Sequence, residues 1–410
     1  MKYILLIGDG MADNPVPELN GKTPLQAAEK PFLDALCAKS TLASVKTVPD
    51  PLPPGTDTAT LSIFGCDPLV YFTGRSPLEA AGCGISVEPG AISYRCNMVA
   101  LEDGDLPYLQ RRILSHNADS IDGETSIQLI TWLCNEPEFK AKAEAIGLRI
   151  EPTPSFRHIA IQVGGDTQGM QAAPPHDHLG EVIGPWVSHG SPNADALGEL
   201  MRLATDKLDH HPINEARRQA GKLPANGIWF WAEGTAVQLP DFRTRYGHTG
   251  SVVSAVPIVH GIGALCGLKP VTVEGATGEI DTNYAGKVEA AIRCLQNDDG
   301  FLCIHIEAPD ESTHNGRLDH KLLAINQLDQ LVAKPVVEWL WQQKMDFRLL
   351  CLSDHKTLMS TRSHDAEPVP YFLYDSRDEL SGGLSYTEEN GAAGPCLDPG
   401  TKLLDLLFEK

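Results

Sequence analysis

The stretch MKYILLIGDG, residues 1–10, decides the fold class of this chain. A short apolar run ends there in a polar turn, and FLCIHIEAPD at 301–310 and FRLLCLSDH at 347–355 repeat the pattern. Runs of four to eight apolar residues that end in turn signals are typical of strands buried on both faces of a parallel sheet. The first run therefore indicates a buried strand rather than a signal peptide.

Helical patterns separate these runs. TPLQAAEKPFLDALCAKS at 23–40 and HKLLAINQLDQLVAKPVVEWLWQQK at 320–344 both have apolar residues at helical spacing. Alternating strands and helices predict an α/β fold with a doubly wound, mostly parallel sheet. Ligands of such sheets bind beyond the carboxyl ends of the strands, where the polar turns of this sequence fall.

The middle of the chain has a different pattern. The segments AISYRCNMVALED, SFRHIAIQVGG and NGIWFWAEG are candidate antiparallel strands, and His, Pro and Gly are frequent between them. We predict that residues 89–254 form a smaller α+β domain. It would be inserted into a core domain made of residues 1–88 and 255–410.

Composition excludes several classes of protein. The chain has 410 residues, and 33 basic against 54 acidic residues give a net charge of −21, which argues against a nucleic-acid partner. No run of about 18 apolar residues is present, so no membrane partner is expected. The ten cysteines include no CxxC pair, and several, such as Cys303 and Cys351, lie in apolar runs. This distribution is typical of reduced thiols in a cytoplasmic protein.

The polar turns contain side chains that bind metals. Carboxylates mixed with imidazoles suit Zn or Mn, accept Co, and accept Mg less readily. Taken alone, an aspartate after a strand is a helix N-cap as often as a metal ligand. A lone Asp-His pair is more often a surface feature than a metal site. Three such clusters at strand ends favour two divalent cations, an arrangement suited to phosphoryl transfer. The candidate ligands are Asp9, Asp310, His314, Asp354, His355 and His364.

A loop rich in Pro and Gly could complete this site with a hydroxyl. In PLPPGTDTATLSIFGCDP, residues 51–68, Thr56 follows Gly55 at the start of a helical pattern. Taken alone, Thr56 or Thr58 is best explained as a helix cap, and Asp57 could also cap or bind a metal. A hydroxyl bound to a divalent cation becomes a nucleophilic alkoxide, so the metal ligands favour Thr56 as nucleophile.

Several motifs together resemble the cofactor-independent phosphoglycerate mutases of the archaeal type, in the alkaline phosphatase superfamily. They include GDGMAD, PPGTDTATLSIFGCDP, GRSPLEAAG, GATGEIDTNYAGK, EAPDESTH, SDH and HDAEPVPYFLYD, and they run nearly end to end. The resemblance implies an alkaline-phosphatase-like core. It also implies that Thr56 is the nucleophile, where close relatives have Ser. It assigns one metal to Asp310, His314 and His364, and the other to Asp9, Thr56, Asp354 and His355.

The resemblance implies a small anionic phosphorylated substrate. Arginine binds phosphate and carboxylate in bidentate fashion, and the inserted domain would serve as substrate-binding lid. The candidate substrate-binding residues are Arg75, Arg157, His176, Asp177 and Arg217.

The expected activity is interconversion of 3-phosphoglycerate and 2-phosphoglycerate through a phosphothreonine enzyme. It would need two divalent metal ions (Mn, Zn, Co or Mg) and no 2,3-bisphosphoglycerate. A homoserine kinase-type phosphotransferase and a metal-dependent phosphatase are alternatives on the same scaffold. A non-catalytic binding protein would be expected to lack some of the ligands. The sequence leaves the oligomeric state open.

Overall fold

The computed structural model describes residues 1–297 and 300–409. The chain divides into a large unit, Met1–Phe72 with Gln238–Lys410, and an inserted unit, Thr73–Val237. The inserted unit thus begins and ends about 16 residues earlier than the segment 89–254 expected from the sequence.

Packing explains both shifted boundaries. Helix α5 (Ser76–Gly82) packs on strands β3 (Ile92–Leu101) and β7 (Gly227–Thr235), so it belongs to the inserted unit. Strand β8 (Gly250–Val253) pairs with β10 (Phe301–Ile306), so it belongs to the large unit. The sequence pattern showed these elements but not the sheet that each one joins.

An eight-stranded sheet forms the centre of the large unit, in the order β15-β2-β14-β11-β1-β10-β8-β9. Strand β1 pairs in parallel with both β10 and β11, and β14 is antiparallel to its two neighbours. The mostly parallel α/β sheet expected from the sequence is therefore confirmed. The remaining strands of this unit are β1 (Lys2–Gly8), β2 (Thr41–Val45), β9 (Lys269–Val271), β11 (Phe347–Leu352), β14 (Val369–Asp375), β15 (Cys396–Leu397) and the separate pair β12 (Lys356–Leu358) and β13 (Ser363–Asp365).

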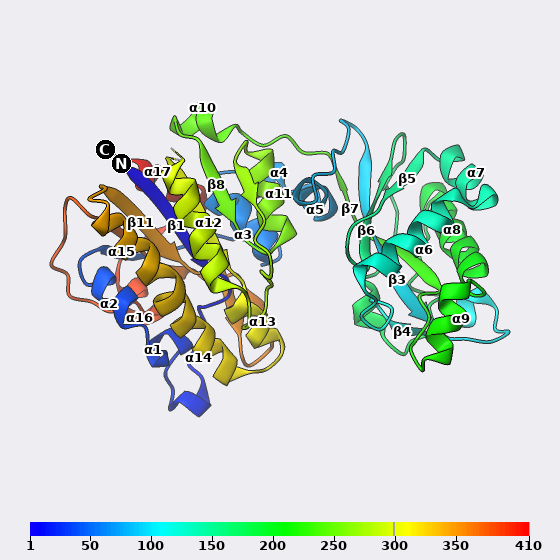
Figure 1. Cartoon of the computed structure of the whole chain (residues 1–410), viewed down its shortest axis with the longest axis horizontal. Coiled ribbons are helices and arrows are strands. Elements are labelled where there is room, and N and C mark those ends of the chain that lie inside the picture. The colour runs from blue at the N-terminus through cyan, green and yellow to red at the C-terminus, as the bar shows by residue number, and fades with distance from the viewer. Residues whose placement is uncertain (298–299, 410) are drawn as a thin grey trace. The chain divides into compact units, whose positions relative to one another are not determined.

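Helices cover both faces of this sheet, which is why its central strands are mostly apolar. Leu5 of β1 lies between Cys303 of β10 and Leu350 of β11, and all three are fully buried. In Figure 1, α12, α14 and α15 lie in front of the sheet and α3 lies behind it. The helices of the large unit are α1 (Pro24–Ala27), α2 (Pro31–Cys37), α3 (Thr56–Ile63), α4 (Pro68–Tyr71), α10 (Phe242–Tyr246), α11 (Pro257–Leu265), α12 (Tyr284–Gln296), α13 (Ala308–His314), α14 (Leu318–Gln327), α15 (Lys334–Gln342), α16 (Glu388–Ala393) and α17 (Leu403–Phe408).

The inserted unit contains a five-stranded antiparallel sheet. Its central strand, β3, pairs with β4, β6 and β7, and β5 pairs with β6. Apolar side chains of the sheet and of the helices packed on it form a separate core. The remaining elements are β4 (Ile113–Ser115), β5 (Leu148–Glu151), β6 (Arg157–Gln162), α6 (Gly123–Asn135), α7 (Pro137–Ala145), α8 (Pro192–Leu208) and α9 (Pro212–Gln219).

Two long helical patterns are divided in the structure. The pattern at 23–40 forms α1 and α2, because Pro31 begins a new helix. The pattern at 320–344 forms α14 and α15, joined by a π-helical segment at Leu328–Ala333. All ten cysteines are free thiols. Among the described residues, no helix has both the length and the apolar character needed to cross a membrane.

Candidate active site

The carboxyl end of the central sheet gathers the metal-competent side chains. Asp9 follows β1, Asp354 and His355 follow β11, and helix α13 with Asp310 and His314 follows β10. Since β1 lies between β10 and β11, these three segments meet at one edge of the sheet. His364 reaches the same place from β13, which pairs with β12 directly after His355.

The first group, named the Asp9 cluster, consists of Asp9, Asp354 and His355. Nε2 of His355 lies 3.2 Å from Oδ2 of Asp354 and 3.4 Å from Oδ1 of Asp9, and all three side chains are fully buried. Oδ1 of Asp354 accepts hydrogen bonds from the backbone N–H groups of Gly10 and His355. Gly10 permits this close packing, because a Cβ there would lie 2.7 Å from Oδ1 of Asp310.

The Asp9 cluster is short of positive charge. Oδ1 of Asp9 and Oδ2 of Asp354 are buried and accept no hydrogen bond from the described residues. Burial, and then the nearby carboxylates of Asp354 and Asp310, raise the pKa of Asp9 well above its ordinary value. Two unpaired carboxylate oxygens and one imidazole nitrogen facing one another are the donor set of a divalent cation.

The second group, named the Asp310 cluster, consists of Asp310, His314 and His364. Nε2 of His314 lies 3.1 Å from Oδ2 of Asp310, as one helical turn of α13 allows, and 3.0 Å from Nε2 of His364. Nδ1 of His314 lies 2.9 Å from the carbonyl oxygen of Arg362. That carbonyl can only accept, so it holds the ring proton on Nδ1 and leaves Nε2 as a lone-pair donor.

The electrostatics of the Asp310 cluster also fit a cation. Hydrogen bonding to Asp310 raises the pKa of His314 to about 9. Burial acts to raise the pKa of Asp310, but hydrogen bonds from His314 and His364 bring it well below its usual range. A divalent cation would replace the protons that these imidazoles otherwise share with the carboxylate.

Thr56 begins helix α3, and its hydroxyl faces the Asp9 cluster. Its Oγ1 lies 3.3 Å from Oδ2 of Asp9 and 3.5 Å from Nε2 of His355. The N-cap residue is Gly55, without a side-chain cap, so neither Thr56 nor Thr58 caps the helix as the alternative reading supposed. The hydroxyl of Thr58 instead donates to the carbonyl of Gly55, and Asp57 accepts from the backbone N–H of Thr58.

Sequence reasoning missed two side chains of this site. Nε2 of His305, within β10, lies 3.1 Å from Oδ2 of Asp9, and burial lowers the pKa of His305 to about 3. Thr357 in β12 donates to Oδ1 of Asp310 over 2.5 Å, and its hydroxyl lies 3.2 Å from Nδ1 of His355, so it links the two clusters. A histidine inside an otherwise apolar buried strand was the available signal for His305.

The inserted unit brings arginines together around a buried glutamate. Glu79 of α5 accepts from Nε of Arg95 over 2.6 Å and makes a second contact to the same guanidinium. Nη1 of Arg157 lies 3.6 Å from Glu79, and burial lowers the pKa of Arg157 to about 10. Arg75 directly precedes α5 and contributes to the positive potential at Glu79. Arg95 and Glu79 were not among the predicted residues.

The other candidate substrate residues have different surroundings. His176 lies 3.6 Å from Asp177 and 5.2 Å, centroid to centroid, from Trp231, and burial lowers the pKa of His176. Arg217 is only 8% exposed, and its guanidinium donates to the backbone carbonyls of Leu223 and Ala118. These bonds give Arg217 a structural role in holding two loops, which the sequence could not distinguish from ligand binding.

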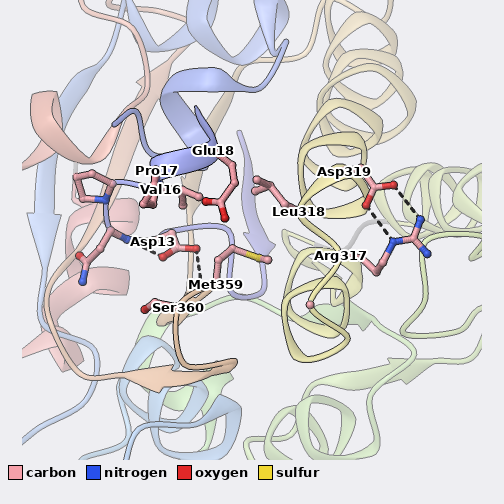
Figure 2. A pocket seen from close by; sticks show the side chains of 12 residues that line it. Asp13, Val16, Pro17, Glu18, Arg317, Leu318, Asp319, Met359 and Ser360 are labelled. Atoms are coloured by element: carbon pink, nitrogen blue, oxygen red, sulfur yellow. Dashed lines mark hydrogen bonds and ion pairs between the residues drawn. The ribbon is translucent and has the colours of Figure 1, made fainter. Parts of the chain in front are cut away.

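The large unit also has a hollow of about 580 Å³, lined by residues of the segments that follow β1, α13 and β12 (Figure 2). Asp13 lies in its wall and accepts from the buried ammonium of Lys321 over 2.9 Å and from the backbone N–H of Met359 over 3.0 Å. At its rim, Arg317 pairs with Asp319. Asp13 and Arg317 thus each have a partner of opposite charge, unlike the carboxylates of the Asp9 cluster.

Comparison with known proteins identifies the family. The family profile described as 2,3-bisphosphoglycerate-independent phosphoglycerate mutase matches residues 37–214. A probable 2,3-bisphosphoglycerate-independent phosphoglycerate mutase of Geobacter sulfurreducens is 38% identical over 412 residues that cover both chains completely. A Methanosarcina acetivorans protein named as that enzyme is 37% identical over 96% of each chain.

Solved structures agree in fold. The PH0037 protein from Pyrococcus horikoshii superposes with a TM-score of 0.78 at 26% identity, covering 100% of this chain and 99% of that one. The cofactor-independent phosphoglycerate mutase from Thermoplasma acidophilum has a TM-score of 0.61 at 23% identity, with 99% and 98% covered, and thus shares the fold. Given the full-length identity to the Geobacter and Methanosarcina proteins, this chain belongs to the 2,3-bisphosphoglycerate-independent phosphoglycerate mutase family.

Proposed function

We propose that this chain interconverts 3-phosphoglycerate and 2-phosphoglycerate without 2,3-bisphosphoglycerate, and that Thr56 carries the phosphoryl group between the two positions. The observation that carries this proposal is the place of the Thr56 hydroxyl, 3.3 Å from Asp9 and 3.5 Å from His355 in a buried site. Family membership supports the choice of substrate.

Two divalent cations fit the donor sets of this site. We assign one to Asp9, Asp354 and His355 together with Thr56, and the other to Asp310, His314 and His364. When bound, such cations make the hydroxyl a better nucleophile and neutralise the charge that phosphoryl transfer develops.

The residues of the chain supply the positioning. Oγ1 of Thr56 gives up its proton and attacks the phosphorus, the bond between phosphorus and the substrate oxygen breaks, and that oxygen takes up a proton, so the step is balanced in protons. Glycerate then turns, its other hydroxyl attacks phosphothreonine, and Thr56 is regenerated. Thr56 also begins α3, and the positive end of this helix would favour the negative charge of a phosphoryl group on Thr56.

We propose that Arg75 and Arg157 of the inserted unit bind anionic groups of the substrate. Guanidinium groups match carboxylate and phosphate in geometry, and Glu79 neutralises only part of the positive charge of these arginines and Arg95. We propose that His176 and Asp177, 3.6 Å apart, also belong to the substrate site, with Asp177 accepting from a substrate hydroxyl. We do not include Arg217 in this proposal, because its Nε and Nη2 donate hydrogen bonds to backbone carbonyls.

The test is a substrate panel on the purified full chain, stripped of metal and then supplied with Mn²⁺. We expect 3-phosphoglycerate to yield 2-phosphoglycerate with Mn²⁺, and neither the metal-free protein nor Thr56→Ala to produce it. Release of free phosphate faster than isomerisation would instead indicate a phosphatase. Phosphate transfer from ATP to homoserine would indicate the kinase-type alternative. Failure to form 2-phosphoglycerate under any metal condition would refute the mutase proposal.

A further inference from the structure

The buried carboxylates of Asp9 and Asp354 have the same arrangement of oxygens but different hydrogen-bond donors. In each, one oxygen is hydrogen-bonded to the protein and the other faces Nε2 of His355 without a hydrogen bond from the described residues. Backbone N–H groups hold Oδ1 of Asp354. Oδ2 of Asp9 instead lies 3.1 Å from Nε2 of His305 and 3.3 Å from the hydroxyl of Thr56.

The direction of hydrogen bonding along the His305 side chain is set by the Asp9 carboxylate, which accepts from Nε2, and it is matched at the far end by Ser254. The backbone N–H of Val256 can only donate, and it donates to Oγ of Ser254 over 2.9 Å. The Ser254 hydroxyl is then free to donate its own proton to Nδ1 of His305, 3.2 Å away. With Nδ1 accepting, the ring proton lies on Nε2 and is donated to Asp9.

This chain of donors crosses three strands. Ser254 follows β8, His305 lies in β10, and Asp9 follows β1, and these strands are adjacent in the sheet. Ser254, His305 and Asp9 are all 0–1% exposed, so water does not compete with their hydrogen bonds. Because His305 stands within a paired strand and Ser254 directly follows one, the sheet sets the position of the Asp9 carboxylate.

We propose that His305 is a positioning residue that, with Ser254 fixing its tautomer, holds Oδ2 of Asp9 and thereby directs Oδ1 toward the cation shared with Asp354 and His355. This inference rests on the proposed function, because only there is Asp9 a metal ligand. Removal of a hydrogen-bond partner of a metal ligand typically weakens metal binding by about 10–100-fold. A merely structural histidine would change stability and leave the metal affinity of the folded protein unchanged.

The experiment measures Mn²⁺ affinity by calorimetry on full-length, metal-stripped protein. In one parent, His314→Ala with His364→Ala removes the Asp310 cluster, so that binding reports the Asp9 cluster alone. Into this parent we introduce His305→Leu, which removes the donor at similar volume, and His305→Gln, whose amide can replace Nε2–H. Ser254→Ala removes the hydrogen bond to Nδ1 of His305, together with the acceptor of the Val256 N–H, and leaves His305 in place. Unfolding of each metal-free variant is recorded separately.

His260→Leu is the matched control. His260 is also a buried histidine, in the neighbouring helix α11, but its Nε2 has no hydrogen-bond partner among the described residues and it makes no contact with Asp9. A second parent carries Asp354→Ala, so that it reports the Asp310 cluster alone. There His305→Leu should leave the affinity unchanged.

We expect His305→Leu to weaken Mn²⁺ binding at the Asp9 cluster by about 10–100-fold, with His305→Gln restoring most of it and Ser254→Ala giving a smaller loss. Unchanged affinity in His305→Leu would overturn the inference, as would an equal loss in His260→Leu or in the second parent. If His305→Leu fails to fold, Ser254→Ala and His305→Gln are compared with the parent instead. Weaker Mn²⁺ binding in Ser254→Ala than in His305→Gln would support the inference, and equal affinity in all three would overturn it.

The failure of this inference differs from the failure of the proposed function. An unmodified chain that binds Mn²⁺ but does not isomerise phosphoglycerate refutes the mutase proposal, while the role of His305 is still decided by the affinities. An unmodified chain that binds no Mn²⁺ overturns both.

Discussion

Replacing Lys321 by methionine should destabilise the large unit strongly, although Lys321 belongs to neither metal cluster. Its side chain is fully buried, and its ammonium donates to Oδ2 of Asp13 over 2.9 Å and to the carbonyl of Thr357 over 2.6 Å. Burial lowers the pKa of Lys321, and the charge of Asp13, itself only 2% exposed, counteracts this. The pair thus fixes α14 to the turn after β1 and to β12.

The expected size of the effect follows from what Lys321→Met leaves behind. Breaking a buried ion pair by removing one partner costs about 3–5 kcal/mol, because the remaining charge is uncompensated. Asp13 keeps the backbone N–H groups of Asn14 and Met359 as donors, which favours the lower end, about 3 kcal/mol. For a unit of this size, that corresponds to a fall in Tm of about 6–12 °C.

Calorimetric and urea unfolding of the metal-free chain measure this change. The exposed pair of Arg317 and Asp319 at the rim of the same hollow provides the control, and Asp319→Asn should leave Tm unchanged (Figure 2). The double variant Lys321→Met with Asp13→Leu should recover part of the loss, because it buries no lone charge. Wild-type stability in Lys321→Met, or an equal loss in Asp319→Asn, would refute this account of the buried pair.

Four further outcomes follow from the site. Thr56→Ala should lower turnover by a factor of about 10⁴ or more while Thr56→Ser keeps measurable activity, and acid-stable labelling of the enzyme by ³²P-phosphoglycerate should vanish only in Thr56→Ala. In metal-free protein, hydrogen bonding to Asp310 raises the pKa of His314 to about 9. The protonated imidazole therefore stabilises the fold fully below about pH 6.5, and this stabilisation is lost as pH rises through about 9. Thermal unfolding against pH should show this loss, and His314→Gln should abolish it. Glu79→Gln should raise KM about tenfold with a smaller change in kcat, because Glu79 orients Arg157. Chelation of metal should abolish turnover and weaken the binding of inorganic phosphate, measured by equilibrium dialysis, with Mn²⁺ restoring both.

The sequence predicted that the candidate metal ligands lie together, because their position depends on one regular feature. In a parallel sheet the carboxyl ends of the strands meet, so Asp9, Asp310 and Asp354 at the ends of three apolar runs had to lie close together. The spacing of Asp310 and His314 matched one turn of a helix, which α13 provides. None of these inferences required knowledge of a distant side-chain contact.

The missed features depend on pairings that no local pattern contains. His305 acquires its role only because β10 pairs with β1 in the register that sets Ile7 opposite His305. Glu79 and Arg95 meet because α5 packs on β3, the same contact that moved the domain boundary. Arg217 has the same guanidinium group as a ligand-binding arginine. Only its burial and its hydrogen bonds to backbone carbonyls show its structural role.

The net charge of −21 gives the proposed cations a second task, in substrate binding as well as in chemistry. Asp9, Asp310 and Asp354 crowd three carboxylates into one buried edge, where burial and then the neighbouring carboxylates raise the pKa of Asp9. Two divalent cations would carry four positive charges against those three, so the sign of the local charge would reverse. The hydroxyl of Thr56 at 3.3 Å from Asp9 then faces a positive site. We therefore expect an anionic phosphate to bind beside Thr56 mainly when the metals are present, so that metal removal weakens phosphate affinity as it abolishes turnover.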